Sequence, residues 1–241
     1  MDFLNALILL LNYIFVPALA YGSQLAIGAI FVTLIYGILR FANFATGDMM
    51  SFGTMVAILF TWYFQSLGLS LGFLPTALLA IPFAILFMGL YMLIIDKFVF
   101  KYYRLNKSPP VQLAMVSIGV MFVTQAVVRI IIGPSDRRFF DGEKFLIRAN
   151  EFKEMTGLNE GLAIKSTQVI TIVVTIILVS TLFWFLNKTK TGKSMRAYSD
   201  NEDLALLSGI DPKKIVMITW MIAAILATIG GVLYGLDKSF K

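Results

Sequence analysis

The chain has 241 residues, of which 59% are hydrophobic and 14% are charged, and its formal net charge is +6. Soluble domains are typically about 45–50% apolar and about 25% charged, so this composition excludes an ordinary soluble protein and indicates an integral membrane protein. The sequence contains neither cysteine nor histidine. Disulfides, thiolate metal sites and the commonest general base are therefore excluded, and we expect no metal site. In a membrane protein a positive charge usually serves orientation, so we expect no nucleic-acid partner.

Apolar runs of membrane-spanning length follow one another along the whole chain. A span needs about 20 apolar residues, and about seven segments approach that length. They lie at about 4–20, 23–39, 49–64, 73–95, 111–132, 169–186 and 215–236. The first is interrupted by Pro17, so a complete span and a re-entrant piece both remain open. The sequence predicts an all-α, polytopic transmembrane helical bundle that forms one domain over 1–241.

A short polar stretch, 40–48, separates the second and third segments. Asn43, Gly47 and Asp48 within it are residue types that form turns and helix N-caps. The structural interpretation is a cap that starts the third segment. The functional interpretation is that these three residues line a central translocation path.

Polar residues also mark one side of the fifth segment. Ser117 and Thr124 are seven positions apart and therefore share a helix face. In a membrane such a face points to another helix or to a water-lined path rather than to lipid. Helix–helix hydrogen bonding and path lining both remain open for this pair.

Three polar regions predict the orientation of the segments. The loop at about 96–110 is basic and aromatic, which is typical of a cytoplasmic face, and we place the stretch 188–214 on the same side. The longest loop, about 133–165, carries balanced charges that suit the outer face. With seven spans, this arrangement places the N-terminus in the cytoplasm.

The stretch 188–214 predicts a short helix between two membrane segments. Ser199 and Glu202 stand three apart, which is the spacing of a capping box. Asp200 and Asp203 then fall in the first turn, where the helix dipole favours acidic side chains.

The sequence also predicts where this helix ends. Leu204, Leu207 and Ile210 form one apolar side. Gly209 is placed for a C-terminal cap, and Pro212 prevents the helix from continuing. Such a helix has to bury its small apolar face against something, whether the membrane surface, a packed loop or a partner.

The last segment has a small residue at every fourth position. These residues are Ala223, Ala227, Gly231 and Gly235. Small residues let helix backbones approach closely in a membrane, so we expect a packing face.

A Gly-Lys-Ser run at 192–194 could be mistaken for a nucleotide-binding loop. A P-loop needs a glycine five positions before Gly192 and a strand leading into it. Asn187 occupies that position, and a membrane segment precedes it. We therefore expect no ATP binding by this chain.

The region from 196 to 235 resembles the cytoplasmic coupling loop and following span of permease subunits of ABC importers, most closely those of the branched-chain amino acid class. The matching elements are 196–197, the acidic helix start at 200–203, the Ala-x-x-x-Gly-Ile pattern near 205–210 and the Gly-Gly-Val-Leu run at 230–233. The stretch 43–48 also matches an element of that family, whose usual histidine is Thr46 here.

The resemblance implies a permease subunit in the plasma (inner) membrane that translocates branched-chain or related amino acids. It implies that the chain is not an enzyme and holds no cofactor, because separate ATPase subunits bind ATP. A second permease subunit, a soluble substrate-binding protein and membrane lipid are the other expected partners. The expected ATPase-coupling residues are Arg196, Ala197, Asp200, Glu202, Asp203, Leu204, Leu207 and Gly209.

Two alternatives stay open. A secondary transporter would need a proton or ion relay, for which the chain offers no histidine and almost no acid inside a span. Family members continue past the span that ends near Gly235, so a shortened membrane fragment that does not transport is the other alternative.

Overall fold

The computed structural model describes residues 2–69, 71–72, 74–139, 145–157 and 160–238, so parts of the predicted outer loop (140–144 and 158–159) lie outside the described residues. Five helices in the described part are long and apolar enough to cross a membrane. They are Phe3–Leu39, Ala77–Leu105, Pro110–Ile132, Ser166–Lys188 and Pro212–Asp237. The prediction of an all-α polytopic bundle is confirmed, whereas the count of seven spans is not.

Long helices form the middle of the bundle, and the short helices and strands lie at its two ends. In chain order they are α1 (Asp2–Leu10), the π-turn η1 (Leu11–Phe15), α2 (Val16–Leu39), α3 (Thr46–Ser66), α4 (Ala77–Ile95), the π-turn η2 (Asp96–Phe100), α5 (Lys101–Leu105), α6 (Pro110–Ile132), β1 (Phe145–Ile147), α7 (Ala149–Thr156), β2 (Ile164–Lys165), α8 (Ser166–Lys188), α9 (Lys190–Asp200), α10 (Glu202–Leu207) and α11 (Pro212–Asp237). The two short strands pair antiparallel within the predicted outer loop. Most of the predicted loop 96–110 is helical, because η2 and α5 continue α4.

The first two predicted spans are one helix. α1, η1 and α2 follow each other without a break from Asp2 to Leu39. A proline disrupts a helix because its ring collides with the carbonyl four residues earlier. For Pro17 that residue is Tyr13, which lies in η1, and the wider turn of a π-helix makes room for the ring. The predicted interruption at Pro17 is therefore wrong, because the helix continues through it.

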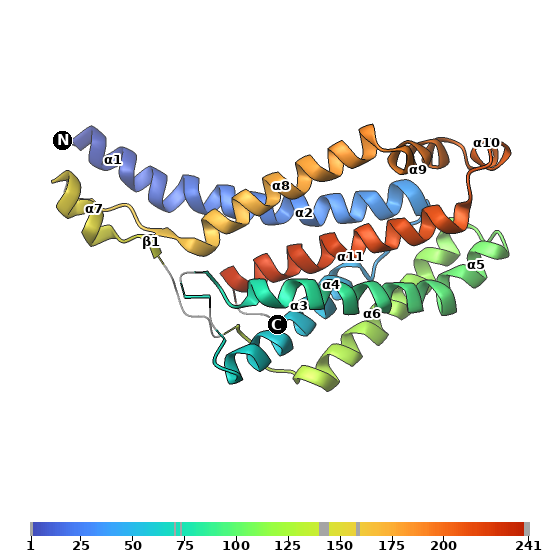
Figure 1. The fold of residues 1–241 in the computed structure, drawn as a ribbon, viewed down its shortest axis with the longest axis horizontal. Helices are drawn as coiled ribbons and strands as arrows, with labels where there is room; N and C mark the ends of the chain where they lie inside the picture. The colour runs from blue at the N-terminus through green and yellow to red at the C-terminus, as the bar shows by residue number, and fades with distance from the viewer. Residues whose placement is uncertain (1, 70, 73, 140–144, 158–159, 239–241) are drawn as a thin grey trace.

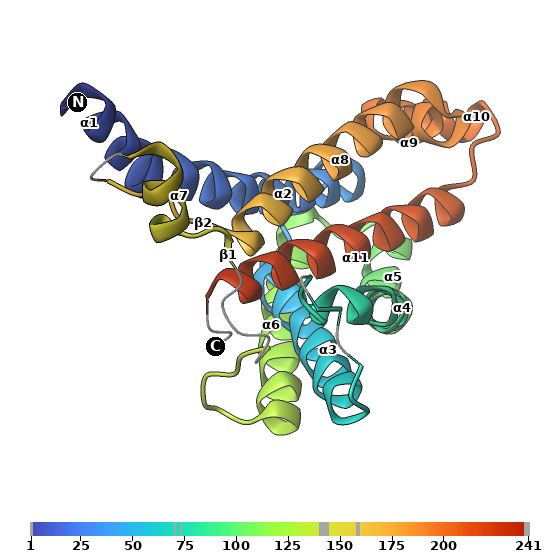
Figure 2. The same cartoon turned by 60° about the vertical axis from the view of Figure 1, so that its left-hand side comes forward.

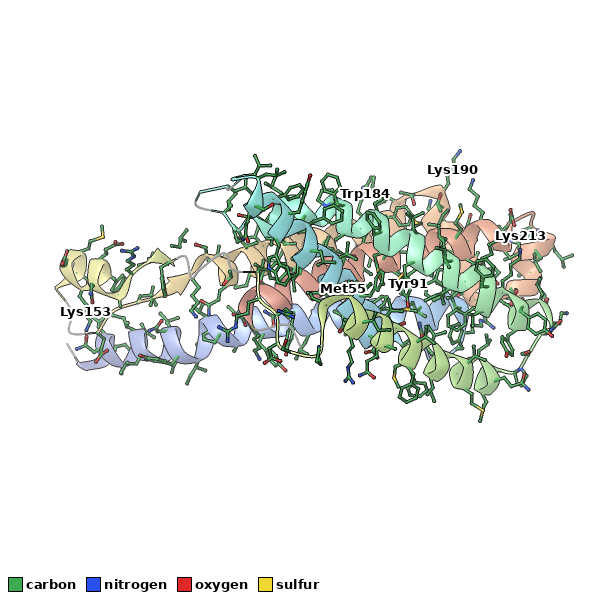
Figure 3. All side chains as sticks on the ribbon, turned by 90° about the horizontal axis from the view of Figure 1, so that it is seen from below. Met55, Tyr91, Lys153, Trp184, Lys190 and Lys213 are labelled. Carbon is green, nitrogen blue, oxygen red and sulfur yellow. The ribbon has the colours of Figure 1, made fainter. Side chains whose placement is uncertain are left out.

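Charged side chains mark the two ends of the long axis. Lys153 of α7 lies at one end, and Lys190 of α9 and Lys213 at the start of α11 lie at the other (Figure 3). The start of α1 lies beside α7 and the paired strands β1 and β2, whereas α5, α9 and α10 gather at the opposite end (Figure 1).

A side chain of the π-turn fixes this arrangement. Asn12 donates from Nδ2 to the carbonyl of Gly161 at 3.5 Å and accepts from the backbone N–H of Ala163 at 3.2 Å. The N-terminal end of α1 therefore lies on the same side as the 133–165 region. The prediction that placed the N-terminus on the opposite side from this region is wrong, because it counted two spans where the chain has one helix.

α11 lies at the centre of the bundle. It runs between a layer formed by α2 and α8 and a layer formed by α3, α4 and α6 (Figure 1, Figure 2). The predicted small residues along it are buried: Ala223, Ala227, Gly231 and Gly235. A Cβ added to Gly231 would overlap Thr54 and lie 2.8 Å from the Met50 carbonyl oxygen. These positions let the backbones of α3 and α11 approach closely, which confirms the predicted packing face.

Candidate functional site

The polar stretch 188–214 folds into two helices instead of one. Asn201 is the N-cap of α10, and its Oδ1 accepts a hydrogen bond from the backbone N–H of Leu204 at 3.0 Å. Ser199 belongs to the last turn of α9. The predicted capping box of Ser199 and Glu202 is therefore wrong, because Asn201 separates the two helices and caps the second.

Gly209 ends α10 as predicted. Its φ of +79° is in the left-handed region that glycine adopts without strain. Its N–H donates to the Leu206 carbonyl at 3.0 Å, and the N–H of Ile210 donates to the Ala205 carbonyl at 3.1 Å. This pair of bonds is a Schellman motif, which satisfies the last carbonyls of the helix. α10 is thus capped at both ends.

The six-residue helix α10 turns most of its surface away from the chain. Leu204 is 62% exposed and Leu207 is 86% exposed, whereas Ala205 is 4% exposed and packs inward. Glu202 and Asp203 are exposed beside them. The predicted apolar side is confirmed for the two leucines, and Ile210 differs because it is half-buried.

α10 is fastened to α9 by a side-chain hydrogen bond. The buried Tyr198 donates from its hydroxyl to Oε1 of Glu202 at 2.8 Å. Burial of the phenol, with this bond and the charge of Glu202, raises the pKa of Tyr198. The phenol therefore stays protonated and remains a donor over the whole physiological range.

The other predicted coupling residues lie on α9. Arg196, Ala197 and Asp200 are exposed there, and Arg196 donates to Oδ1 of Asn187 at 3.0 Å. The structure thus brings all the predicted coupling residues to one end of the molecule, although two helices carry them.

Arg40 connects this region to α2. Its left-handed φ of 55° ends α2, and its guanidinium donates to the carbonyl oxygens of Ser199 and, at 2.9 Å, Asp200. Ser199 donates in return from Oγ to the Gly37 carbonyl at 2.5 Å. The last carbonyls of a helix carry partial negative charge, so a cation is favourable there. The ends of α2 and α9 are thereby held together, a role of Arg40 that sequence reasoning missed.

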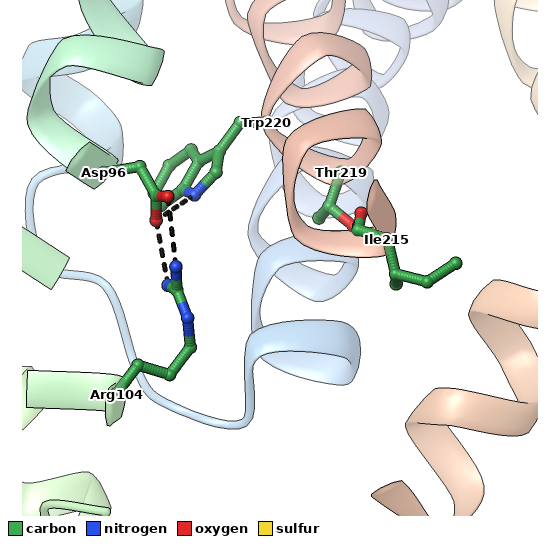
Figure 4. A network of polar contacts seen from close by, with 5 residues as sticks. All are labelled: Asp96, Arg104, Ile215, Thr219 and Trp220. Carbon is green, nitrogen blue, oxygen red and sulfur yellow. Dashed lines mark hydrogen bonds and ion pairs between the residues drawn. The ribbon is translucent and has the colours of Figure 1, made fainter. Parts of the chain in front are cut away.

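A second polar cluster lies where α4 meets α11 (Figure 4). Asp96 accepts hydrogen bonds from Nη1 and Nη2 of Arg104 at 2.8 and 3.0 Å, and from Nε1 of Trp220 at 2.8 Å. The Trp220 ring stacks on Phe100, with centroids 5.6 Å apart, and Phe100 contacts Phe41. Sequence reasoning missed this anchor, although a single acid within a basic stretch was a signal.

Gly192 shows why the Gly-Lys-Ser run is present. The N–H of Gly192 donates to Oγ1 of Thr189, the N-cap of α9, at 3.0 Å. A Cβ on Gly192 would lie 2.8 Å from the Leu186 carbonyl oxygen. The glycine therefore allows α9 to fold closely against the end of α8, and the surroundings are helical rather than those of a P-loop.

Asn43 and Ser117 stabilise the non-helical segment between α2 and α3. The buried Asn43 accepts from the backbone N–H of Ala45 at 3.0 Å. The hydroxyl of Ser117 on α6 accepts from the N–H of Phe44 at 2.9 Å. Each side chain therefore satisfies backbone groups where the chain is not helical.

Thr124 lies about two turns further along the same face of α6. Its Oγ1 is 2.6 Å from the hydroxyl of Tyr91 on α4, and Tyr91 stacks on Phe52 of α3. Ser117 and Thr124 are both fully buried. For this pair the geometry favours hydrogen bonding between elements over lining of a path.

Gly47 and Asp48 occupy the first turn of α3. Gly47 is exposed, and a Cβ added to it would meet no neighbouring atom within 4 Å. Asp48 lines a cavity of about 370 Å³ between α3 and α6. The structure therefore separates the predicted path residues into three buried groups (Asn43, Ser117 and Thr124), one exposed glycine and one carboxylate that lines a cavity.

The sequence of this chain is similar to those of known membrane permeases. The family described as the permease component of branched-chain amino acid transport systems matches residues 14–240. The high-affinity branched-chain amino acid transport system permease protein LivH of Escherichia coli K12 is 27% identical over 218 residues, which cover 89% of this chain and 67% of LivH. The corresponding protein BraD of Pseudomonas aeruginosa is 26% identical over 224 residues, covering 92% of this chain and 70% of BraD.

A third relative gives a similar match. The probable branched-chain amino acid transport permease protein LivH of Methanocaldococcus jannaschii is 26% identical over 223 residues, covering 89% of this chain and 63% of that protein. The chain thus spans about two thirds of the length of these relatives. No solved structure matches it.

Proposed function

Because the chain belongs to the family of branched-chain amino acid transport permease components, we propose that it is the membrane-spanning permease subunit of an ABC importer for branched-chain or related amino acids. The chain is a multi-pass transport subunit and not an ATPase. Separate ATPase subunits bind and hydrolyse ATP, and the chain holds no cofactor. We further propose that the chain lies in the inner membrane. It assembles there with a second permease subunit and receives substrate from a soluble substrate-binding protein.

The surface of α10 is the observation that carries this proposal. Leu204 and Leu207 are exposed on a capped helix, beside Glu202 and Asp203. Burying a leucine side chain is favourable by about 1.5–3 kcal/mol, so an exposed pair on a rigid helix supports docking into an apolar groove. The two acids complement a groove with a basic rim. We assign that groove to the ATPase subunit.

Movement of the ATPase subunits reaches the membrane helices through the contacts of α10. The hydrogen bond between Tyr198 and Glu202 joins α10 to α9 and so to α8. The cap at Gly209 leads directly into α11. Arg40 adds a connection to α2. A push on α10 therefore moves three long helices together, which is what alternating access requires.

The orientation follows from the same assignment. If α10 meets an ATPase, the end that holds α5, α9 and α10 is cytoplasmic, in agreement with the basic residues of 96–110. The 133–165 region is then outside. The start of α1 lies with that region, so we propose an external N-terminal end.

Co-purification from detergent tests the proposal. We expect an ATPase subunit to accompany the wild-type chain and to be lost from the double variant Asp203→Lys, Leu204→Arg. The matched control is Glu154→Lys, Met155→Arg, which makes the same changes on exposed residues of α7 at the other end of the molecule. This control should retain the ATPase.

Two other outcomes of this experiment would contradict parts of the proposal. Retention of the ATPase by the α10 variant would reject α10 as the docking element. Absence of any ATPase from the wild-type preparation would reject the importer, and would leave a secondary transporter or a fragment that does not transport.

A further inference from the structure

A cavity of about 370 Å³ between α3 and α6 combines opposite charges with an apolar wall. Asp48 and Ser51 line it from α3, Gln125 and Arg129 line it from α6, and a second acid, Asp136, lines it from the segment that follows α6. Val128 and Ile132 supply the apolar part of the wall. The volume is within the range of about 300–1,000 Å³ that is usual for pockets binding small molecules.

The cavity lies between the first turns of α3 and the C-terminal end of α6. α6 has 23 residues and begins at Pro110, so Gln125 and Arg129 lie beyond its middle. Asp48, in the first turn of α3, faces them across the cavity. The non-helical residues before α3 reach the first half of α6, where the N–H of Phe44 donates to Oγ of Ser117, so this backbone lies at membrane depth. Such backbone is tolerated there only where it is buried in protein or lines a water-filled space.

The carboxylate of Asp48 and the guanidinium of Arg129 form no close ion pair with each other in the described part of the chain. Asp48 and Arg129 attract each other electrostatically. Within the described part of the chain, neither side chain forms a hydrogen bond or a close ion pair with another residue. Ionisable groups are costly in a membrane and usually mark the route of a substrate or ion. Both groups are thus available to a ligand.

We propose that this cavity binds an α-amino acid in transit, with Arg129 receiving the α-carboxylate and Asp48 the α-ammonium group. A guanidinium matches a carboxylate with two parallel hydrogen bonds, and a carboxylate accepts from an ammonium group. Val128 and Ile132 contact the apolar side chain of the substrate. The inference rests on the proposed function and deepens it, because it locates the substrate within this chain.

The charge pair also explains selection by the cavity. A ligand with only one charged group bonds either Asp48 or Arg129 and loses the second charge-assisted hydrogen bond. A zwitterion satisfies both. The cavity should therefore prefer an amino acid to an amine or a carboxylic acid of the same shape.

The lack of cysteine in the sequence permits a direct test. Ser51→Cys places a single thiol in the cavity, and its reaction rate with a methanethiosulfonate reagent is measured in the complete detergent-solubilised transporter. We expect L-leucine to slow the reaction. Isoamylamine and 4-methylpentanoate, which each lack one charged group, should need roughly tenfold higher concentrations for the same protection. Lys101→Cys, an exposed thiol on α5, is the control that leucine should not protect.

Charge variants complete the test. In the Ser51→Cys background, Asp48→Asn and Arg129→Gln should each raise the leucine concentration needed for protection about tenfold. Lys101→Gln, which removes an exposed charge outside the cavity, should not. Gln125→Cys supplies a second thiol in the cavity if Ser51→Cys does not assemble.

The results separate this site from the proposed function. ATP-dependent leucine uptake without protection of the thiol would overturn the site and leave the importer. Protection without ATP-dependent uptake would support the site and overturn the importer. Equal protection by isoamylamine or 4-methylpentanoate, or unchanged protection in both charge variants, would overturn recognition of a zwitterion.

Discussion

Replacing Asp96 by asparagine should destabilise the chain strongly, because this carboxylate serves three donors. It accepts two hydrogen bonds from Arg104 and one from Trp220. Asparagine keeps one acceptor oxygen and places an N–H₂ group against donors. The guanidinium of Arg104 then loses its counter-charge at a position where the two side chains are only 24% and 15% exposed.

The size of the effect follows from those bonds. A hydrogen bond to a charged group contributes about 1.5–3 kcal/mol, and removing one partner of a buried pair costs about 3–5 kcal/mol. Since both side chains keep some contact with solvent, we expect Asp96→Asn to lower the free energy of unfolding by about 2–4 kcal/mol. Trp220→Phe loses one donor, which should cost about 1–2 kcal/mol. It also replaces a fully buried indole by a smaller phenyl ring, which adds the cost of a cavity.

The measurement is unfolding by SDS in mixed micelles, followed by circular dichroism. The variants are Asp96→Asn, Arg104→Gln and the two together, with Lys101→Gln as a control on the exposed surface. Direct partners should show an interaction energy of about 1 kcal/mol or more in this cycle. Additive effects of the two single changes, within about 0.5 kcal/mol, would refute the assigned ion pair.

Two further substitutions probe the backbone. Gly209→Val forces a β-branched residue into a left-handed conformation, at a cost of about 1–3 kcal/mol, so ATP hydrolysis should no longer drive uptake although the chain remains in the membrane. Gly209→Asn, which tolerates that conformation better, should retain uptake, and normal uptake by the valine variant would contradict the cap. Gly231→Val should lower the yield of monodisperse protein on gel filtration, because it overlaps Thr54 and overpacking costs about 1–3 kcal/mol or more. Gly119→Ala, whose Cβ meets no atom within 4 Å, is its control, and equal yields would argue against close packing of α3 on α11.

Local features of the sequence were predicted well. Gly209 adopts the expected left-handed cap, and the small residues along α11 are buried. Each depends on a few neighbouring positions or on a simple period, so the sequence contains the information. The helix α9 was missed because its polar composition hid a weak pattern. Its buried residues, Gly192, Met195 and Tyr198, recur every third position, which was a usable signal.

Distant partners could not be predicted in this way. Arg40 and Asp200 are 160 positions apart, and Asp96 and Trp220 are 124 apart. The local sequence around Arg40 or Asp96 does not indicate the distant partner, because each contact depends on how whole helices pack. The break expected at Pro17 failed for a related reason, since the chain accommodates this proline directly after η1 without ending the helix.

The continuous first helix is longer than a bilayer is thick. It has 37 residues, or about 56 Å at 1.5 Å per residue, whereas the hydrocarbon layer measures about 30 Å. Even at a tilt of about 40°, the layer encloses only about 39 Å of it. About three turns therefore stand beyond the lipid tails. The bonds of Asn12 place the N-terminal part of this helix beside the paired strands β1 and β2, and the exposed Phe3 and Leu4 form an apolar surface there.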